Sequence, residues 1–351
     1  MLIAMDHPYD RARRTRPHPP EQPAPAGVAG DDPVRLSPGD VAGDDPVRVS
    51  PRGASARNPV RDSTVGVVIA TRNRAAGLAG TLRHLLALPE RPPVLVVDNA
   101  STDHTRALLA RDFPQVRVLA LPVNRGALAR THGVRSIGTP YVAFSDDDSW
   151  WAPGALAEAA RLFDAHPRLG LLAARTLVGP DQDPDPLNDV LAASPLGPAT
   201  DLPGTQVLGF LACAAVVRRT AYLDAGGFHQ VLFFGGEESL LAYDLAARGW
   251  GVTHCPEVVA HHHPGTGGPR PGRVAVQRRN ELLTAWLRRP LPYVLARTRD
   301  LAADACHDPH ARRALREALA RLPAALRARR TLPPYLEHAV RLLDGTPGDP
   351  A

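Results

Sequence analysis

Three consecutive aspartates, Asp146–Asp148, directly follow a short apolar strand pattern, Tyr141–Phe144. Side chains two apart on an extended chain share a face, so Asp146 and Asp148 are expected to converge while Asp147 points away. Two carboxylates at the end of a strand suit a hard cation such as Mg²⁺ or Mn²⁺, which neutralises phosphate charge. An isolated Asp-x-Asp is more often a solvated turn, so the cation site depends on the elements around it.

Those elements alternate between strand and helix. Val-rich strands are predicted at 65–70, 93–97, 116–119 and 141–144, with helices between them at 77–88, 102–113 and 126–137. This alternation predicts a mostly parallel sheet sandwiched by helices. Ligands bind outside the carboxyl ends of such strands. Thr71, Asp98 and Asp146 follow three of those ends, so we expect them at one edge of the sheet.

The second half of the chain is more mixed. Strands are predicted at 171–178, 211–217, 251–254 and 258–262, helices at 153–166, 220–225 and 237–248, and a loop at 180–203. From about residue 277 the pattern is helical. A leucine stripe there, which Pro323 interrupts, lies beside several arginines and consists of Leu315, Leu319, Leu322 and Leu326. We expect this stripe to face the core; the alternative is an amphipathic helix on an anionic membrane.

Length and composition divide the chain into three parts. With 351 residues and 44% hydrophobic residues, it has enough apolar mass for one large domain plus appendages. Residues 1–62 are rich in Pro, Arg, Asp and Gly without apolar periodicity, and predict a disordered tail. The α/β domain is expected at 63–265 and a helical C-terminal extension at 266–351.

Charge and cysteine content limit partners and compartment. The net charge is +5, all 41 basic residues are Arg, and no nucleic-acid-binding motif accompanies them, so no nucleic-acid partner is expected. Three widely spaced cysteines favour a reducing compartment. The first 20 residues lack the apolar core of a signal peptide, and no apolar run reaches the ~18 residues of a membrane span. We expect a cytoplasmic protein. Peripheral contact of its C-terminal helices with the inner face of the membrane is an additional possibility.

Seven segments in a fixed order carry a resemblance to a known family. They are Val67–Arg74, Val96–Asp103, Asn124–Gly126 followed by Arg130, Phe144–Asp148, Gly226–Phe228, Phe234–Glu238 and Pro256 through His263. Together they resemble family 2 glycosyltransferases of the GT-A fold, over about 200 of the 351 residues. The resemblance implies an inverting enzyme that moves a sugar from a nucleotide-sugar donor, of the UDP- or dTDP-hexose type, to an acceptor hydroxyl. The acceptor would be a glycan, a lipid-linked molecule or a small molecule.

The resemblance also assigns a metal, Mn²⁺ or Mg²⁺, to the aspartates. Asp146 would contact the nucleotide ribose and the metal, and Asp148 would bind the metal. Some family members take a third ligand from a histidine near His261–His263, and the spacing favours His262. Imidazole joins carboxylates readily on Mn²⁺; without the upstream acids these histidines would be an ordinary polar loop.

Nucleotide contacts are implied for several further residues. Asp98 would accept from the N–H of a pyrimidine ring, unless it merely stabilises a helix N-terminus. Thr71 and Arg74 would flank the nucleotide, together with Asn124 and Asp147. Arg130 would contact the diphosphate or the base through its planar guanidinium, or form a salt bridge inside the helical cover.

Glu237-Glu238 is the predicted catalytic pair. An inverting displacement needs a carboxylate that accepts the proton of the attacking hydroxyl. Glu238 aligns with the Asp of the family's usual Glu-Asp and is one methylene longer, so Glu237 shares or takes the role in an alternative assignment. A third interpretation makes both acids helix N-terminal stabilisers. This departure keeps a catalytically silent nucleotide-sugar-binding protein as the alternative function.

Two further features complete the interpretation. A nucleotidyltransferase would carry a Gly-rich basic loop after its first strand, whereas no glycine follows Thr71 until Gly77. Trp150-Trp151 would stack on a sugar or pack beneath the aspartate loop, and we favour packing.

Overall fold

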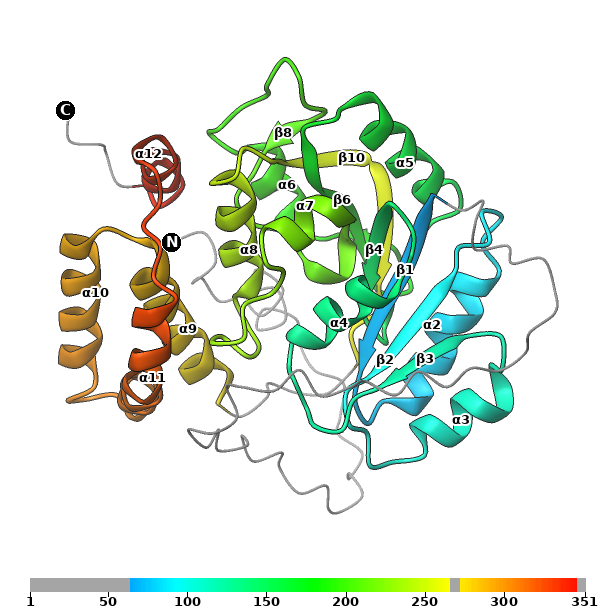
Figure 1. Ribbon diagram of the computed structural model, residues 1–351, viewed down its shortest axis with the longest axis horizontal. Coiled ribbons are helices and arrows are strands. Elements are labelled where there is room, and N and C mark those ends of the chain that lie inside the picture. Colours follow the sequence, from blue (N-terminus) through cyan, green and yellow to red (C-terminus); the bar gives the residue numbers. More distant parts are fainter. Residues whose placement is uncertain (1–63, 266–271, 346–351) are drawn as a thin grey trace.

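The computed structural model describes residues 64–265 and 272–345, so the predicted tail at 1–62 lies outside the described residues. One sheet runs through the described part, in the strand order β3-β2-β1-β4-β9-β6-β10-β5 (Figure 1). In chain order these strands are β1 (Val65–Thr71), β2 (Val94–Asp98), β3 (Arg117–Ala120), β4 (Tyr141–Ser145), β5 (Ser149–Trp151), β6 (Leu169–Val178), β9 (Ala215–Arg218) and β10 (Gly251–His262). The short β7 (Asp183–Pro184) pairs with β6, and β8 (Thr205–Gln206) pairs with β10.

Helices cover both faces of this sheet and extend beyond it. Those of the α/β part are α2 (Ala75–Leu86), α3 (Thr105–Asp112), α4 (Leu128–Ser136), α5 (Ala155–Ala165), α6 (Leu187–Ala192), α7 (Arg219–Asp224) and α8 (Glu237–Ala246). The C-terminal helices are α9 (Arg273–Arg288), α10 (Leu291–Asp304), α11 (Pro309–Arg327) and α12 (Pro334–Leu343). None of the described helices is long and apolar enough to cross a membrane.

The first four predicted strands pair in parallel, as their pattern indicates. β1 lies between β2 and β4, and β3 extends the sheet beyond β2. Beyond β4 the sheet is mixed, because β9 runs antiparallel to both β4 and β6. Together with its helical cover this is the α/β architecture of the GT-A fold.

Three local predictions were wrong. The two extended pieces at 251–254 and 258–262 form the single strand β10, because a register shift between Cys255 and Val259 lets one strand continue. The strand predicted from Leu211 begins only at Ala215, after a 3₁₀ turn, η2 (Ala212–Ala214). The loop predicted at 180–203 contains α6.

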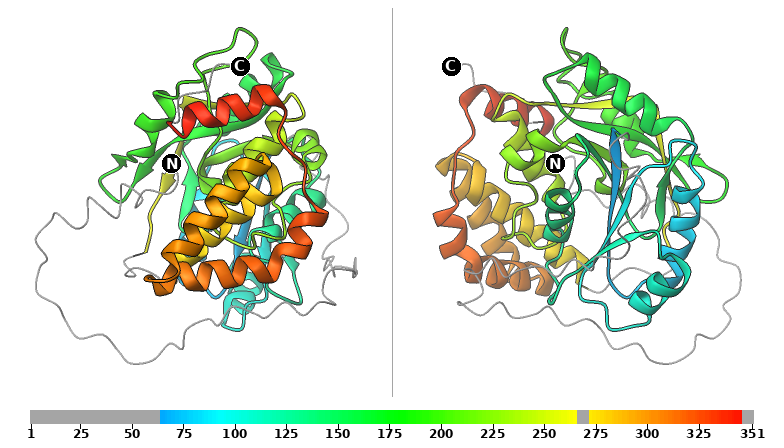
Figure 2. Two further views of the ribbon diagram at one scale, coloured as in Figure 1. Left: turned by 90° about the vertical axis from the view of Figure 1, so that its left-hand side faces the viewer. Right: turned by 45° about the vertical axis from the view of Figure 1, so that its right-hand side comes forward.

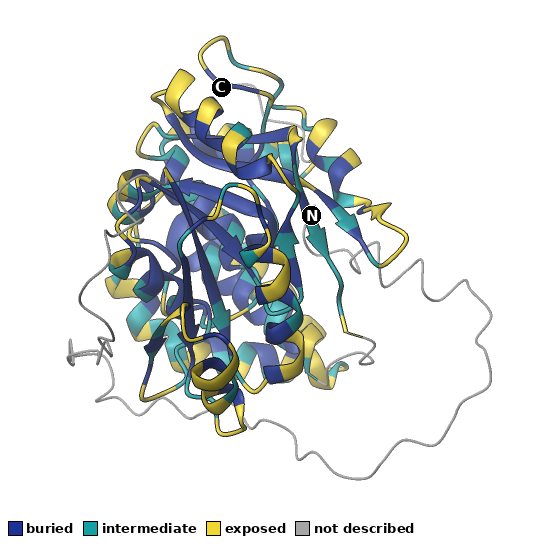
Figure 3. Ribbon diagram, turned by 90° about the vertical axis from the view of Figure 1, so that its right-hand side faces the viewer, coloured by how far each residue is buried: buried dark blue, intermediate teal, exposed yellow. Residues whose placement is uncertain are grey.

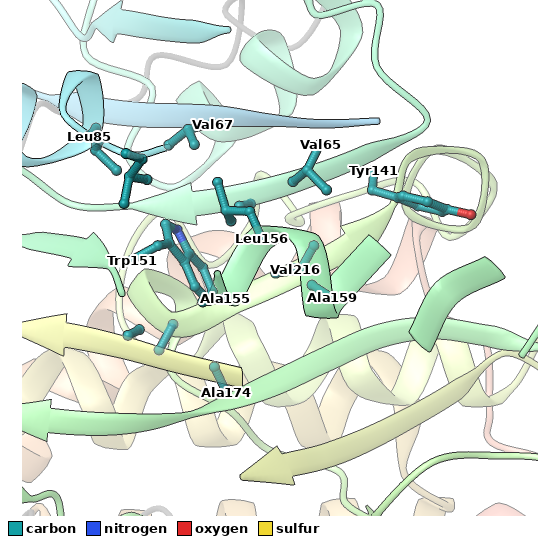
Figure 4. Close-up of a cluster of buried hydrophobic side chains, with 14 of the residues drawn as sticks. Val65, Val67, Leu85, Tyr141, Trp151, Ala155, Leu156, Ala159, Ala174 and Val216 are labelled. Carbon is teal, nitrogen blue, oxygen red and sulfur yellow. The ribbon is translucent and has the colours of Figure 1, made fainter. Parts of the chain in front are cut away.

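Each face of the sheet buries its own apolar cluster, as the alternation of side chains along a strand requires. Val67 and Ile69 of β1 pack with leucines of α2 and α5, while Val68 between them packs on the opposite face with residues of α4 and α8. Figure 4 shows part of the first cluster, with Trp151 beside Leu156, and Figure 3 shows the sheet as the buried centre of the molecule.

The C-terminal helices share cores with the α/β part. Trp286 and Leu283 of α9 pack in one cluster with Leu232 and Leu240, and Leu336 of α12 packs beside Leu241 of α8. The α/β part and the C-terminal extension are therefore joined by continuous apolar contacts.

Helix α11 packs in a core shared with the α/β part, as expected, but its leucine stripe faces that core only in part. The buried face of α11 consists of alanines, Ala311, Ala314, Ala318 and Ala325, whereas Leu315 and Leu322 are partly buried. Leu319 and Leu326 are exposed. Helix α11 also continues through Pro323 to Arg327, so this proline does not interrupt it.

Candidate functional site

Register brings the ends of β1, β2 and β4 to one edge of the sheet. Thr71 is the partner of Asp98 across β1 and β2, and Ile69 is the partner of Ser145 across β1 and β4. Asp146–Asp148 follow Ser145 and therefore lie level with Thr71. Residues from three separate strand ends thus meet at this edge, where doubly wound sheets bind ligands.

The aspartates are arranged differently from the expected alternation. Strand β4 ends at Ser145, so residues 146–148 form a turn to which the two-residue period of a strand does not apply. Asp146 forms an ion pair with Arg130, while Asp147 and Asp148 both contact Arg74. The expectation that Asp147 points away from the site was wrong.

Asp147 is held by the first strand and its following loop. Its carboxylate accepts hydrogen bonds from Thr71 Oγ1 and Arg74 Nε, each at 3.1 Å. Burial raises the pKa of Asp147 to about 6, although the charge of Arg74 opposes this shift. The guanidinium of Arg74 also lies 3.4 Å from Asp148 Oδ2. Arg74 thereby fixes two of the three aspartates.

Asp148 and His262 are the described residues that best fit a divalent cation. Nε2 of His262 lies 3.6 Å from Oδ1 of Asp148, because the antiparallel pairing of β10 with β5 sets His262 opposite Ser149. Among residues 64–265 and 272–345, no three His, Cys, Asp or Glu side chains form a complete metal cluster. A carboxylate and an imidazole nevertheless suit Mn²⁺, and such ions commonly complete their shell with substrate phosphate and water.

The two tryptophans after the aspartates have different environments. Trp151 is fully buried in the sheet core, which agrees with the packing interpretation. Trp150 is half-buried and stacks on His84, with ring centroids 4.0 Å apart, while His261 and His263 pack against it. The outer two histidines thus pack against Trp150, whereas the His262 ring lies beside the Asp148 carboxylate.

Asp98 is fully buried, and both its carboxylate oxygens have protein partners. Oδ1 accepts from the Ser101 amide at 3.1 Å, and Oδ2 accepts from Arg106 Nε. A direct contact between Asp98 and a nucleotide base would require the half-exposed Arg106 side chain to move.

The β3–α4 loop is ordered by Asn99, which was not among the predicted site residues, and by Asn124, which was. Asn99, next to Asp98, accepts from the Arg125 amide at 2.7 Å and donates to the Gly126 carbonyl at 3.2 Å. Asn124 accepts from the Gly126 amide at 2.9 Å, so its side chain is used inside its own loop. The sequence placed Asn99 at a strand end, which was the available signal.

Arg130 lies between the aspartates and the glutamate pair. Its buried guanidinium forms an ion pair with Asp146 and lies within electrostatic reach of Glu237 and Glu238. It also lies 5.9 Å from the Phe228 ring centroid. Of the two sequence alternatives, the structure contains the salt bridge. The acidic segments, about 90 residues apart in the chain, therefore share one cation.

The glutamates begin α8, after two glycines with left-handed backbone, Gly235 (φ +89°) and Gly236 (φ +79°). Glu237 is buried, and its Oε2 has no hydrogen-bond partner among the described residues. Glu238 is half-buried and more accessible. Burial raises the pKa of both carboxyl groups, and Arg130 opposes the shift.

The C-terminal helix α9 holds the loop before these glutamates, which sequence reasoning missed. Buried Asn280 donates to the carbonyls of Phe234, at 2.8 Å, and of Gly235. Buried Arg279 donates to the Leu232 carbonyl at 2.9 Å and to Glu317 of α11. No sequence motif in α9 predicts this role, because Asn280 and Arg279 bind backbone carbonyls of the loop, and every loop has carbonyls whatever its sequence.

Comparisons with known proteins agree with the fold. The family described as Glycosyl transferase family 2 matches residues 66–225, which include the aspartates and end before Glu237. N-acetylglucosaminyl-diphospho-decaprenol L-rhamnosyltransferase of Mycobacterium tuberculosis is 27% identical over 271 residues, covering 65% of this chain and 88% of that protein. Succinoglycan biosynthesis protein ExoU of Rhizobium meliloti is 32% identical over 99 residues, covering 27% of this chain and 29% of that protein.

Among solved structures, GalNAc-T7 with UDP, GalNAc and Mn²⁺ aligns with a TM-score of 0.55 at 15% identity, covering 68% of this chain and 50% of that one. At this identity the likeness concerns the fold alone.

Proposed function

Because the chain is a family 2 glycosyltransferase with the GT-A fold, we propose that it is an inverting enzyme that uses a UDP- or dTDP-hexose donor with the help of a divalent cation. The observation that carries this proposal is the position of Arg130, between Asp146 at the sheet edge and the glutamates of α8. A donor at the aspartates and a proton acceptor at α8 would then lie on either side of Arg130.

Glu238 is the proposed general base. The acceptor hydroxyl attacks the anomeric carbon opposite the leaving diphosphate, and Glu238 takes the proton as the new C–O bond forms. Burial raises the pKa of Glu238, which makes it a stronger base than an exposed glutamate, and the positive charge of Arg130 opposes that shift. Glu237 is the weaker candidate, since its side chain is buried.

Asp148 and His262 are the proposed metal-binding residues, with Asp146 beside them at the nucleotide. Mn²⁺ or Mg²⁺ bound there would neutralise charge that develops on the departing diphosphate. Arg74, released from Asp147 and Asp148 as they engage the donor, supplies a second positive charge for the phosphates. Thr71, Asp98 and Asn124 would complete the nucleotide site.

We propose a lipid-linked acceptor. The mycobacterial relative is named for a lipid-linked acceptor, N-acetylglucosaminyl-diphospho-decaprenol, and the alignment spans 88% of that relative. The enzyme would then act in the cytoplasm, at the inner face of the membrane.

Ligand-dependent thermal stability tests the donor site. UDP or dTDP with Mn²⁺ should raise the melting temperature of the full chain by mass action. EDTA, or Asp148→Ala, should remove that increase. Equal stabilisation without any divalent cation would contradict the metal assignment.

Turnover separates the enzyme from the silent alternative. Wild-type chain should hydrolyse one of a panel of nucleotide sugars in the presence of Mn²⁺, and Glu238→Gln should bind the same donor without turnover. Donor binding without turnover by the wild type, on both hydrolysis and transfer assays, would favour a silent binding protein.

A further inference from the structure

Helix α11 has the reverse of the usual arrangement of small and large apolar residues. Its buried face is made of alanines that are 0% exposed, whereas Leu319 and Leu326 are 49% and 57% exposed. A helix that only packs on its neighbours would bury leucines first, since each buried leucine contributes about 1.5–3 kcal/mol. The outward leucines therefore need a different explanation.

The same outward face carries arginines. At 100° per residue, Arg316, Leu319, Pro323, Leu326 and Arg327 share one side of α11, which we name the α11 outer face. No hydrogen bond or ion pair joins Arg316 or Arg327 to another described residue. Most other arginines of these helices have carboxylate or carbonyl partners, for example Arg279 and Arg313 on Glu317.

Charge is concentrated in the surrounding helices. Residues 272–345 contain 15 arginines and seven acidic residues, while the whole chain carries only +5. Helix α10, which lies beside α11 at the edge of the molecule farthest from β3 (Figures 1 and 2), exposes two further leucines, Leu291 and Leu295. Exposed leucines flanked by unpaired arginines are typical of helices that lie in the interface of an anionic bilayer.

We propose that the α11 outer face docks on an anionic phospholipid surface. Leu319 and Leu326 would enter the headgroup region, while Arg316 and Arg327 would contact lipid phosphates. This inference rests on the proposed lipid-linked acceptor, because only a membrane-bound acceptor gives the enzyme a reason to bind a bilayer. Through Arg279 and Glu317, α11 is also connected to the loop before Glu238.

Vesicle flotation of the full chain tests the proposal. The chain should float with vesicles that contain phosphatidylglycerol and stay behind with pure phosphatidylcholine, and high salt should release it. Arg316→Gln combined with Arg327→Gln should lower the partition coefficient about 30-fold, since each basic residue near an anionic surface contributes about 1 kcal/mol. Leu319→Ser combined with Leu326→Ser should lower it as well.

The matched control is Arg83→Gln combined with Arg91→Gln, which removes two exposed charges from the region of α2. It should leave flotation within twofold of the wild type, and the melting temperatures of all variants should confirm folding. Equal loss in this control, or binding to neutral vesicles, would overturn the proposal. A dimer of the wild type that the leucine variant dissociates would also overturn the proposal, because the α11 outer face would then bind a second copy of the chain.

Flotation does not depend on catalysis. A chain that floats but neither hydrolyses nor transfers sugar keeps the docking surface and removes the proposed function. A chain that turns over a donor but does not float keeps the proposed function and removes the docking surface.

Discussion

Glu238 stands where the resembling family has an aspartate, and the extra methylene changes its reach. Glu238→Gln keeps the shape but cannot accept a proton, so we expect transfer to fall about 10²–10⁴-fold while donor binding stays unchanged. Steady-state transfer rates and donor titrations would measure both. Glu237→Gln is the matched control, because it makes the same change at the adjacent, buried carboxyl group. A large loss in Glu237→Gln with little in Glu238→Gln would assign the base to Glu237.

Arg130 should set the pH at which that base works. Burial raises the pKa of Glu238 and the charge of Arg130 lowers it, so the rate should rise with pH as Glu238 ionises. Arg130→Gln removes the opposing charge and should move this ascending limb to higher pH. Arg130→Lys keeps a positive charge and should move it less. Superimposable profiles of kcat/KM against pH for the three proteins would contradict this electrostatic role.

At the residue scale, the sequence located the acidic groups but not their partners. Residue type and order identified Asp146, Asp148 and Glu238, because the chemistry demands carboxylates. The pairing of Asp147 with Thr71 and Arg74 was missed, since strand alternation was applied beyond the end of β4. The salt bridge between Arg130 and Asp146 remained one of two alternatives, because a guanidinium serves a phosphate and a carboxylate equally well.

At the scale of elements, helix α9 holds the loop before the proposed base through Asn280. Asn280→Ala removes donors to the carbonyls of Phe234 and Gly235, which lie just before Gly236 and the glutamates. A shift of the base by about 1 Å costs up to about 10²-fold in rate. We therefore expect kcat to fall about 10- to 100-fold with the KM for the donor unchanged, because the aspartate end of the site is not touched.

Gln277→Ala, one turn earlier on α9 and half-buried, is the control and should leave kcat unchanged. Asn280→Asp keeps the shape but loses the donors, so it should behave like Asn280→Ala. A purely structural role would instead lower the melting temperature and leave kcat of the folded fraction intact.

The sequence predicts most of the strands and helices, but it predicts only part of the pairing between strands. The parallel run from β1 to β4 followed from Val-rich strands separated by helices. The antiparallel insertion of β9 and the continuity of β10 across its bulge did not, because both depend on pairing with distant strands. The requirement for glycine at Gly126 is equally non-local: a Cβ there would collide with the carbonyl of Phe233, more than 100 residues away.

At the scale of the whole molecule, the C-terminal helices and the α/β part should unfold together. Val231 and Leu232 pack among residues of α9 and α10, and Leu336 and Val340 of α12 pack in the core under the sheet. Cores shared in this way predict one cooperative transition in urea, monitored by tryptophan fluorescence and by circular dichroism. Two separated transitions would show that the extension unfolds on its own.

The buried ion pair between Arg288 and Asp244 provides the sharpest test of this coupling, since it joins α9 to α8. Arg288 donates to Asp244 through Nε at 2.6 Å and through a terminal nitrogen at 2.9 Å, with both side chains buried. Arg288→Met leaves Asp244 uncompensated and should lower the free energy of unfolding by about 3–5 kcal/mol. Adding Asp244→Leu should recover most of that loss, because the buried charge is then gone.

The exposed pair of Arg161 with Glu158 supplies the comparison: Arg161→Met should leave the free energy of unfolding close to that of the wild type. If Arg288→Met shifted only a minor unfolding transition and left the transition of the sheet unchanged, the C-terminal helices and the α/β part would unfold independently. Loss of the whole transition in one step would instead mean that the helices which position Glu238 also stabilise the sheet that carries Asp146 and Asp148.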